Sequence, residues 1–123
     1  MTFVHRETVR FRDLDSLGHM NNAVYATFLE QARIALLAPL GAQVTNMILA
    51  RLEIDFRAQV SLGDEVEIEV TPGRVGTKSF ELAYAMRVRG TVVAEAKTVL
   101  VAYDYGRAQS VEVPDEWKER LAA

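Results

Sequence analysis

Residues 22–37, NAVYATFLEQARIALL, have the clearest helical pattern in the chain. One face has apolar side chains at helical spacing: Tyr25, Phe28, Leu29, Ala32 and Leu36. A second apolar row follows about a third of a turn or more away: Ala23, Ala26, Ile34 and Leu37. Few polar positions interrupt these rows, so the pattern predicts a helix that is buried around most of its circumference and ends at Pro39 and Gly41.

After an ambiguous linker at residues 42–47, the period of the apolar residues changes from helical to two. Alternating segments predict strands at 50–57, 65–70, 80–88 and 91–103, with Pro72-Gly73 ending the second of them. Residues 3–11 add a first strand, and residues 114–121 could form a short surface helix. The predicted fold is α+β, a single domain over residues 1–123 in which a five-stranded antiparallel sheet wraps one long buried helix.

The predicted strand at 91–103 is apolar on both faces. This pattern is typical of a central strand, or of one that a partner covers. Long unpaired edges are also expected in a five-stranded sheet curled around one helix, and proteins normally cover or pair such edges.

The composition excludes several classes of site. The 123 residues include no cysteine and only two histidines, and the formal charge is −3. We therefore expect no disulfide framework, no thiolate nucleophile, no metal site and no cofactor. The charge balance gives no support to nucleic-acid binding, and no apolar run approaches the roughly 20 residues of a membrane span. Charges begin early at the N-terminus, which predicts no signal peptide and a cytoplasmic location.

A polar loop precedes the predicted helix, between a strand end near Phe11 and a helix start near Asn22. It contains two carboxylates, a glycine, a histidine and two asparagines: Asp13, Asp15, Gly18, His19, Asn21 and Asn22. The loop thus holds acids beside the partly positive end of a helix. A carboxylate that faces free backbone N–H groups suits attack on a carbonyl, because the N–H groups stabilise the developing oxyanion.

These blocks together resemble the 4-hydroxybenzoyl-CoA thioesterase family of hot-dog proteins. The resemblance covers most of the chain in order: Asp13-Leu14-Asp15, Gly18-His19-Met20-Asn21-Asn22, Tyr25, 29–33, 52–57, Leu62-Gly63-Asp64 and 76–80. It implies the hot-dog fold, hydrolysis of an acyl-CoA substrate, and homodimers that share their active sites and pair into homotetramers.

The resemblance also implies roles for the loop residues. Asp15 occupies the catalytic position, as a nucleophile that forms a mixed anhydride or as a general base that activates water. The backbone amide of Asn22 is the expected oxyanion donor, although Asn21 and Asn22 are also good helix caps. Asp13 is expected to be structural, Gly18 to supply an unusual backbone conformation, and His19 to shape the substrate pocket by hydrogen bonding.

Other candidates lie outside the loop. Tyr25 and Phe56 are either core residues or part of an acyl pocket, and Lys78 and Ser79 are candidates for binding coenzyme A. Further cations that could meet its phosphates are Arg57, Arg74 and Arg87. Glu30 is a rival catalytic acid, because other hot-dog branches place their acid on this helix. Its simpler interpretation is an ion pair with Arg33 one turn away.

Two other function classes are compatible with this sequence. A hot-dog dehydratase or hydratase would use His19 with an acid to move protons on a hydroxyacyl thioester, and a non-catalytic module would bind acyl-CoA without hydrolysing it. The Asp-x-Asp and Asn-Asn pattern favours the hydrolase. The acyl group, and the choice between coenzyme A and acyl carrier protein thioesters, are left open.

Overall fold

The computed structural model describes residues 1–123, except for the side chains of residues 42–45. Five long strands and one long helix dominate it, and the elements in chain order are β1 (Phe3–Thr8), a 3-10 helix (Phe11–Asp13), α1 (Asn22–Leu37), a second 3-10 helix (Ala38–Thr45), β2 (Met47–Phe56), β3 (Glu65–Val75), β4 (Ser79–Val88), β5 (Thr91–Asp104), β6 (Gln109–Ser110) and α2 (Asp115–Ala122). Residues 42–45 of the linker predicted from the sequence lie outside the described side chains.

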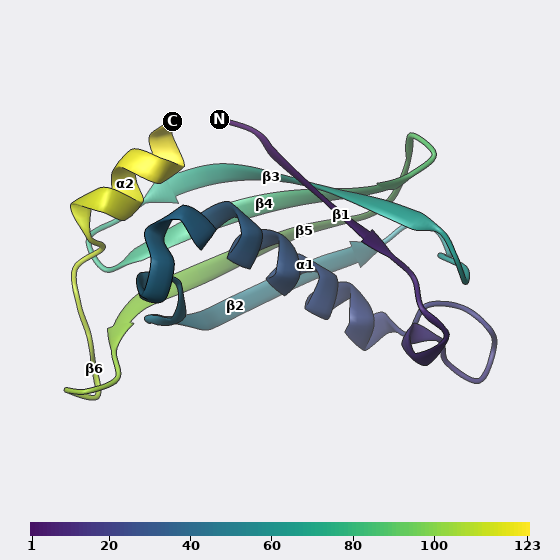
Figure 1. Ribbon diagram of the computed structural model, residues 1–123, viewed down its shortest axis with the longest axis horizontal. Coiled ribbons are helices and arrows are strands. Elements are labelled where there is room, and N and C mark those ends of the chain that lie inside the picture. Colours follow the sequence, from purple (N-terminus) through teal and green to yellow (C-terminus); the bar gives the residue numbers. More distant parts are fainter.

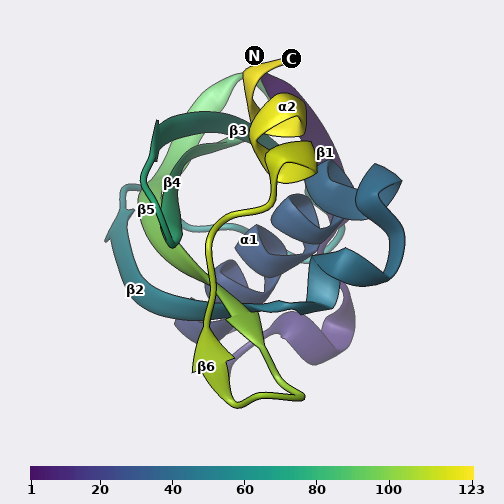
Figure 2. The ribbon, with the colours of Figure 1, turned by 90° about the vertical axis from the view of Figure 1, so that its left-hand side faces the viewer.

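The strands form one antiparallel sheet in the order β1-β3-β4-β5-β2, and the short β6 pairs with β5. Seen from its end, the sheet curls around α1, and α2 closes one end of the curl (Figure 2). The two chain termini lie close together beside α2 in both views (Figure 1). The predicted five-stranded antiparallel sheet around one long helix is confirmed, and the short β6 is an addition to it. Of the two interpretations of the strand that is apolar on both faces, the structure shows the first, because β5 lies between β4 and β2.

The helix is buried on one face because the sheet covers only one side of it. The first predicted row is buried: Tyr25, Phe28, Leu29, Ala32 and Leu36. These side chains pack against the inner face of the sheet, which includes Ile68, Leu82, Met86 and Leu100. The prediction of burial around most of the circumference is wrong for a single chain, since Ala23 is exposed and Ile34 is 41% exposed.

The ends of β1 and β3 differ from the sequence prediction. The first strand ends at Thr8, because the chain turns at Arg10 into the 3-10 helix Phe11–Asp13. Pro72-Gly73 does not end β3, which continues to Val75 through an irregularity in register between Pro72 and Val75. Such a bulge accommodates a proline within a strand, because the local ladder is already interrupted.

The C-terminal helix is more than a surface element. Trp117 and Leu121 on α2 are 1% and 3% exposed, and the Trp117 ring meets the Phe80 ring edge to face with centroids 6.0 Å apart. The helix therefore extends the core over the end of the sheet that contains Phe80. Of the helices whose side chains are described, none is both long and apolar enough to cross a membrane.

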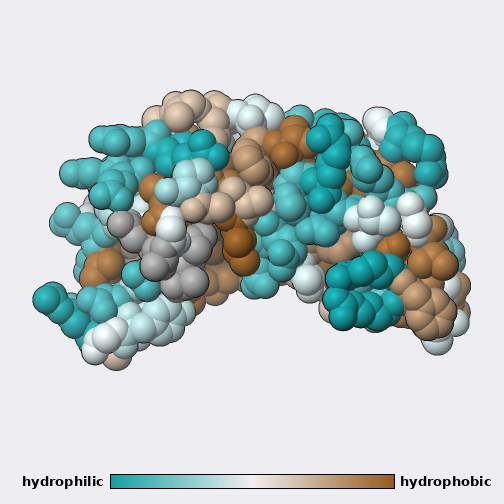
Figure 3. Space-filling model, viewed as in Figure 1, coloured by the Kyte–Doolittle hydropathy of each residue, from teal (hydrophilic) through white to brown (hydrophobic). Residues whose placement is uncertain are grey.

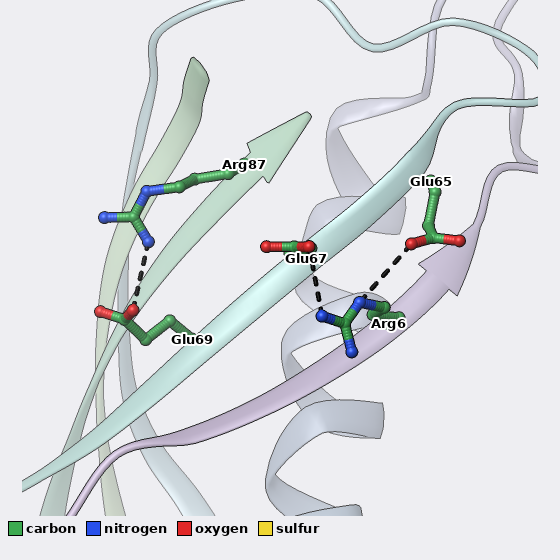
Figure 4. A network of polar contacts seen from close by, with 5 residues as sticks. All are labelled: Arg6, Glu65, Glu67, Glu69 and Arg87. Atoms are coloured by element: carbon green, nitrogen blue, oxygen red, sulfur yellow. Dashed lines mark hydrogen bonds and ion pairs between the residues drawn. The ribbon is translucent and has the colours of Figure 1, made fainter. Parts of the chain in front are cut away.

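The outer face of the sheet is charged. Arg6 on β1 lies between Glu65 and Glu67 on β3, with N–O distances of 3.5 and 3.3 Å, and Arg87 on β4 lies 3.3 Å from Glu69 (Figure 4). These pairs join neighbouring strands on a face that is open to solvent in the single chain. Pairs of this kind contribute at most about 1 kcal/mol each, so they specify register more than they stabilise the fold.

Candidate active site

The loop between β1 and α1 is closed by its own hydrogen bonds. The Asp15 N–H donates to the His19 carbonyl at 2.8 Å, and the Gly18 N–H donates to the Asp15 carbonyl at 3.2 Å. Gly18 has a φ of +83°, a left-handed conformation that side chains disfavour, so the expectation of an unusual backbone at Gly18 is confirmed. The loop forms a tight turn with Asp15 at its base.

The Asp15 carboxylate has one engaged oxygen and one free oxygen. Its Oδ1 accepts hydrogen bonds from the Leu17 N–H at 2.8 Å and from the His19 N–H at 3.3 Å. Its Oδ2 has no hydrogen bond to any described residue. The two backbone bonds orient the carboxylate, and one oxygen is left available for chemistry.

Asp13 is buried and bound to Arg10, as expected for a structural residue. It is 5% exposed, and its Oδ2 accepts from the Arg10 backbone N–H at 2.8 Å and from Arg10 Nε at 3.3 Å. Burial by itself would raise the pKa of Asp13, but the hydrogen bonds from Arg10 and the charges of Arg10 and Arg12 outweigh it and hold this pKa below its ordinary value. The Asp13 carbonyl in turn accepts from the Asn21 N–H at 2.9 Å, which fixes the start of α1.

The first turn of α1 leaves one backbone donor available beside the loop. Asn21 is the N-cap, and its Oδ1 accepts from the Ala23 N–H at 2.9 Å, while its carbonyl accepts from the Val24 N–H at 2.9 Å. With the Asn21 N–H bound to Asp13, the Asn22 N–H has no hydrogen bond to any described residue. Helix N-termini leave such donors unpaired, and the helix dipole adds a partial positive charge there.

Asp15 and Asn22 line the same cavity, which measures about 390 Å³. The other lining residues come from the loop, from α1 and from the segment after β2: Leu17, His19, Met20, Tyr25, Phe56, Arg57, Ala58 and Gln59. Five of the residues predicted from the sequence to form the site are therefore brought together: Asp15, His19, Asn22, Tyr25 and Phe56. A further cavity of about 320 Å³ is lined by residues of β2, β3, β4 and β5, and none of these five site residues lines it.

Two aromatic rings form a wall of the 390 Å³ cavity. Tyr25 and Phe56 meet edge to face, with ring centroids 5.0 Å apart and planes at 89°. The Tyr25 hydroxyl donates to the Ala58 carbonyl at 3.2 Å, and burial raises the pKa of Tyr25, so the phenol stays protonated. Tyr25 is 3% exposed whereas Phe56 is 48% exposed, so Tyr25 is also a core residue and Phe56 is not.

Lys78 and Ser79 lie away from this cavity within one chain. Ser79 pairs with Val101 on β5, whereas Phe56 pairs with Ala94, so the two positions are roughly 20 Å apart along the strand. Of the other cations considered, Arg57 lines the cavity and lies 3.3 Å from Glu95, and Arg87 is engaged with Glu69. Among the cations considered for coenzyme A, Arg57 is the one that lines the cavity, at the point where β2 ends.

Glu30 forms the ion pair with Arg33 that was its simpler interpretation. It lies 3.7 Å from Arg33, which is 6% exposed, and it does not line the cavity that contains Asp15. The predicted ion pair is confirmed. No group of three or more His, Cys, Asp or Glu side chains among the described residues is arranged to hold a metal ion.

Several lining residues were missed by sequence reasoning. Leu17 and Met20 belong to the loop itself, and Ala58 and Gln59 follow Phe56 directly. Met20 binds that segment, because its N–H donates to the Val60 carbonyl at 2.7 Å. The polar residues that follow the strand at Phe56 were the available signal, although it is the pairing of Met20 with Val60 and of His19 with Ser61 that brings them to the loop.

Comparison with known proteins identifies the family of this chain. Residues 9–121 match the model of the thioesterase-like superfamily. A 1,4-dihydroxy-2-naphthoyl-CoA hydrolase from Nostoc punctiforme is 30% identical over 94% of this chain and 84% of its own length. A Thermus thermophilus thioesterase, solved in complex with coenzyme A and Zn, is 32% identical with a TM-score of 0.88 over 97% of this chain and 90% of that one.

A 1,4-dihydroxy-2-naphthoyl-CoA thioesterase structure from Synechocystis is 19% identical with a TM-score of 0.90, covering 99% of this chain and 96% of that one, and this likeness concerns the fold alone. The predicted hot-dog fold is confirmed by these structures, and the expectation of a thioester hydrolase is confirmed at the level of the family. This chain belongs to the thioesterase-like superfamily.

Proposed function

We propose that this protein hydrolyses acyl-CoA thioesters to a free acid and coenzyme A, with Asp15 as its catalytic carboxylate and the Asn22 amide as its oxyanion donor. One observation carries the proposal: the free Oδ2 of Asp15 and the unpaired N–H of Asn22 belong to residues that line one cavity. An acid and an oxyanion donor on the same cavity are what attack on a thioester carbonyl requires.

The chemistry follows from the two groups. The thioester carbonyl oxygen accepts the Asn22 N–H, which stabilises negative charge as it develops on that oxygen. As nucleophile, Asp15 Oδ2 bonds to the carbonyl carbon and the thiolate of coenzyme A leaves and takes up a proton; water then hydrolyses the mixed anhydride and regenerates Asp15. As general base, Oδ2 takes a proton from water while the water oxygen attacks, and the departing thiolate receives that proton.

The cavity favours an aromatic acyl group. Its wall is the Tyr25–Phe56 ring pair, and flat aromatic groups pack well against ring edges and faces. The Nostoc punctiforme relative is named for an aromatic acyl-CoA, 1,4-dihydroxy-2-naphthoyl-CoA. We infer a substrate of this class, in which the aromatic ring lies against Phe56.

The proposed assembly is a homodimer that pairs into a homotetramer. β2 is an edge strand with exposed apolar side chains: Ile48, Leu49, Leu52 and Phe56, exposed by 37, 39, 38 and 48%. A long edge strand with exposed apolar side chains is normally covered, and pairing with β2 of a second copy would cover this one. A second copy is also the route by which Lys78 and Ser79 could reach the cavity. A cytoplasmic location stays a prediction.

The test is an assay of hydrolysis with a panel of short, long and aromatic acyl-CoAs, in which the release of the free thiol of coenzyme A is measured. Asp15→Asn should lower kcat by roughly a hundredfold or more, because asparagine neither attacks nor accepts a proton. Glu30→Gln, a matched carboxylate-to-amide change, should keep most of the activity because Glu30 faces Arg33 instead of the cavity.

Each other outcome has a definite meaning. Unchanged hydrolysis by the Asp15→Asn variant would remove Asp15 from the mechanism, and loss in Glu30→Gln alone would assign the role to Glu30. If the unchanged protein hydrolyses none of the panel, the acyl-CoA-binding module replaces the hydrolase; dehydration of a hydroxyacyl-CoA would favour the dehydratase.

A further inference from the structure

Arg89 occupies a backbone position that disfavours arginine. It forms the β4–β5 hairpin turn with Gly90, and both residues have positive φ, +48° and +79°. Two-residue hairpin turns with this geometry strongly prefer Asn-Gly, because side chains other than Asn and Asp resist positive φ. An arginine at this position therefore costs backbone energy, and a contact of its side chain is a reason for its presence.

The side chain of Arg89 reaches Asp64 in the turn that connects β2 to β3. Arg89 Nη1 lies 3.0 Å from Asp64 Oδ1, and the other Asp64 oxygen, Oδ2, accepts from the Ser61 N–H at 2.9 Å. The Asp64 side chain is only 14% exposed, although that of Arg89 is 79% exposed. The Ser61 hydrogen bond foremost, and then Arg89, lower the pKa of Asp64, so this carboxylate is charged at neutral pH.

The turn held by Asp64 lies between the end of β1 and the loop that contains Asp15. On one side, the Gly63 N–H donates to the Val9 carbonyl at 3.0 Å, and the Val9 N–H donates to the Asp64 carbonyl at 2.9 Å. On the other side, the Met20 N–H donates to the Val60 carbonyl at 2.7 Å, and His19 forms a β-bridge with Ser61.

His19 links this turn to Asp15. Its carbonyl accepts from the Asp15 N–H at 2.8 Å and its own N–H donates to Asp15 Oδ1 at 3.3 Å. The contacts therefore run from Arg89 through Asp64 to Ser61, across the β-bridge to His19, and from His19 to Asp15. The Asp15 loop is otherwise largely exposed, with Leu17 at 79% exposure, and Figure 3 shows apolar surface gathered at that end of the molecule.

We propose that Asp64 and Arg89 are positioning residues, which hold the Ser61–Asp64 turn so that the loop at 15–20 keeps the Asp15 carboxylate directed at the carbonyl bound by the Asn22 N–H. The catalytic part of this inference rests on the proposed function, whereas the effect on the loop does not. Misplacement of a reacting group by a fraction of an ångström to 1 Å is enough to lower a rate by one to two orders of magnitude.

The decisive variant is Arg89→Asn, because asparagine suits the backbone of the turn and yet cannot reach Asp64. We expect an unchanged or higher melting temperature, and amide hydrogen exchange at Met20 about tenfold faster while exchange at Ile68 in the core of β3 is unchanged. In hydrolysis assays kcat should fall roughly tenfold with KM much less affected, since the substrate contacts remain. The fall in kcat should be smaller in Arg89→Lys than in Arg89→Asn, because lysine keeps the positive charge.

Arg107→Asn is the matched control. Arg107 is 76% exposed and forms a comparable ion pair with Asp104 at 3.7 Å, but it lies in the turn between β5 and β6. This variant should leave kcat and the exchange of Met20 unchanged. Asp64→Ala should reproduce the effects of Arg89→Asn more strongly, because it also removes the acceptor for the Ser61 N–H.

Normal exchange at Met20 together with normal kcat in both Arg89→Asn and Asp64→Ala would overturn the proposal. Equal acceleration of exchange at Met20 and Ile68 would overturn it as well, because that pattern indicates general destabilisation. If the unchanged protein hydrolyses no thioester, the proposed function fails, yet exchange at Met20 still decides whether Asp64 and Arg89 position the loop.

Discussion

The rings of Tyr25 and Phe56 meet edge to face across the cavity wall, with centroids 5.0 Å apart, although one belongs to α1 and the other to the end of β2. Tyr25 is fixed by burial and by its hydrogen bond to the Ala58 carbonyl, whereas Phe56 is half exposed. The wall therefore has one rigid ring and one ring that a ligand or a second chain could cover.

Phe56→Ala should weaken substrate binding more than it weakens the fold. Loss of the edge-to-face contact is expected to lower the free energy of unfolding by about 1 kcal/mol, and KM for an aromatic acyl-CoA should rise several-fold as the wall is removed. Tyr105→Ala is the matched control, since Tyr105 is 59% exposed and pairs edge to face with Tyr103 outside this cavity. Equal KM values for the two variants would argue against an acyl site at Phe56.

Asn22→Pro should remove the oxyanion donor while preserving the helix. Proline is favoured at the first helical position, and Asn21 already has an extended conformation (φ −61°, ψ 139°) that a following proline accepts. We expect kcat to fall by on the order of a hundredfold with an unchanged melting temperature. Asn22→Ala, which keeps the N–H, should retain activity; a similar loss in both variants would assign the role to the side chain instead.

Asp13→Asn should destabilise the protein in a pH-dependent manner. The change removes a charged acceptor of three hydrogen bonds from Arg10 and should lower the free energy of unfolding at pH 7 by about 1 to 3 kcal/mol. Because the pKa of Asp13 is lower in the folded protein than its unfolded value near 4, the unfolded chain binds more protons in this range.

The stabilisation by Asp13 is therefore fully present above about pH 4 and is lost as pH falls through the lowered pKa. Urea unfolding between about pH 2 and pH 7 should show a smaller loss of stability on acidification in Asp13→Asn than in the unchanged protein. Parallel curves for the two proteins would show that another carboxylate, such as Asp64, dominates acid unfolding.

Trp117→Ala should destabilise the fold without altering the site. Trp117 is 1% exposed and packs on Phe80, at the end of β4 opposite to the cavity. Truncation of a buried tryptophan costs about 3 to 5 kcal/mol, which urea unfolding should reveal. The kcat measured at low temperature on the folded fraction should be unchanged; a lower kcat there would contradict the separation of α2 from the site.

The elements with strong periodicity were the predictable ones. The helix at 22–37 has the boundaries of α1, because the cap at Asn21 and the apolar row from Tyr25 to Leu36 are local features. The alternating strands were also recognisable, apart from the continuation of β3 past Pro72, which depends on pairing with β4 across a bulge. The burial of Arg33 could not be read from the pattern, because it depends on contacts with Glu30 and with Tyr84 on the sheet.

The sequence by itself determined the order of helix and strands, the acidic loop before the helix and the candidacy of Asp15 and Asn22, since capping, turn chemistry and apolar period are set by neighbouring residues. Only the tertiary structure decided which distant residues join them. Phe56 reaches the cavity because β2 ends beside α1, Lys78 and Ser79 lie at the start of β4 beside the far end of β5, and Arg89 contacts Asp64. These placements follow from strand pairing and register between segments far apart in the chain, and no local pattern encodes them.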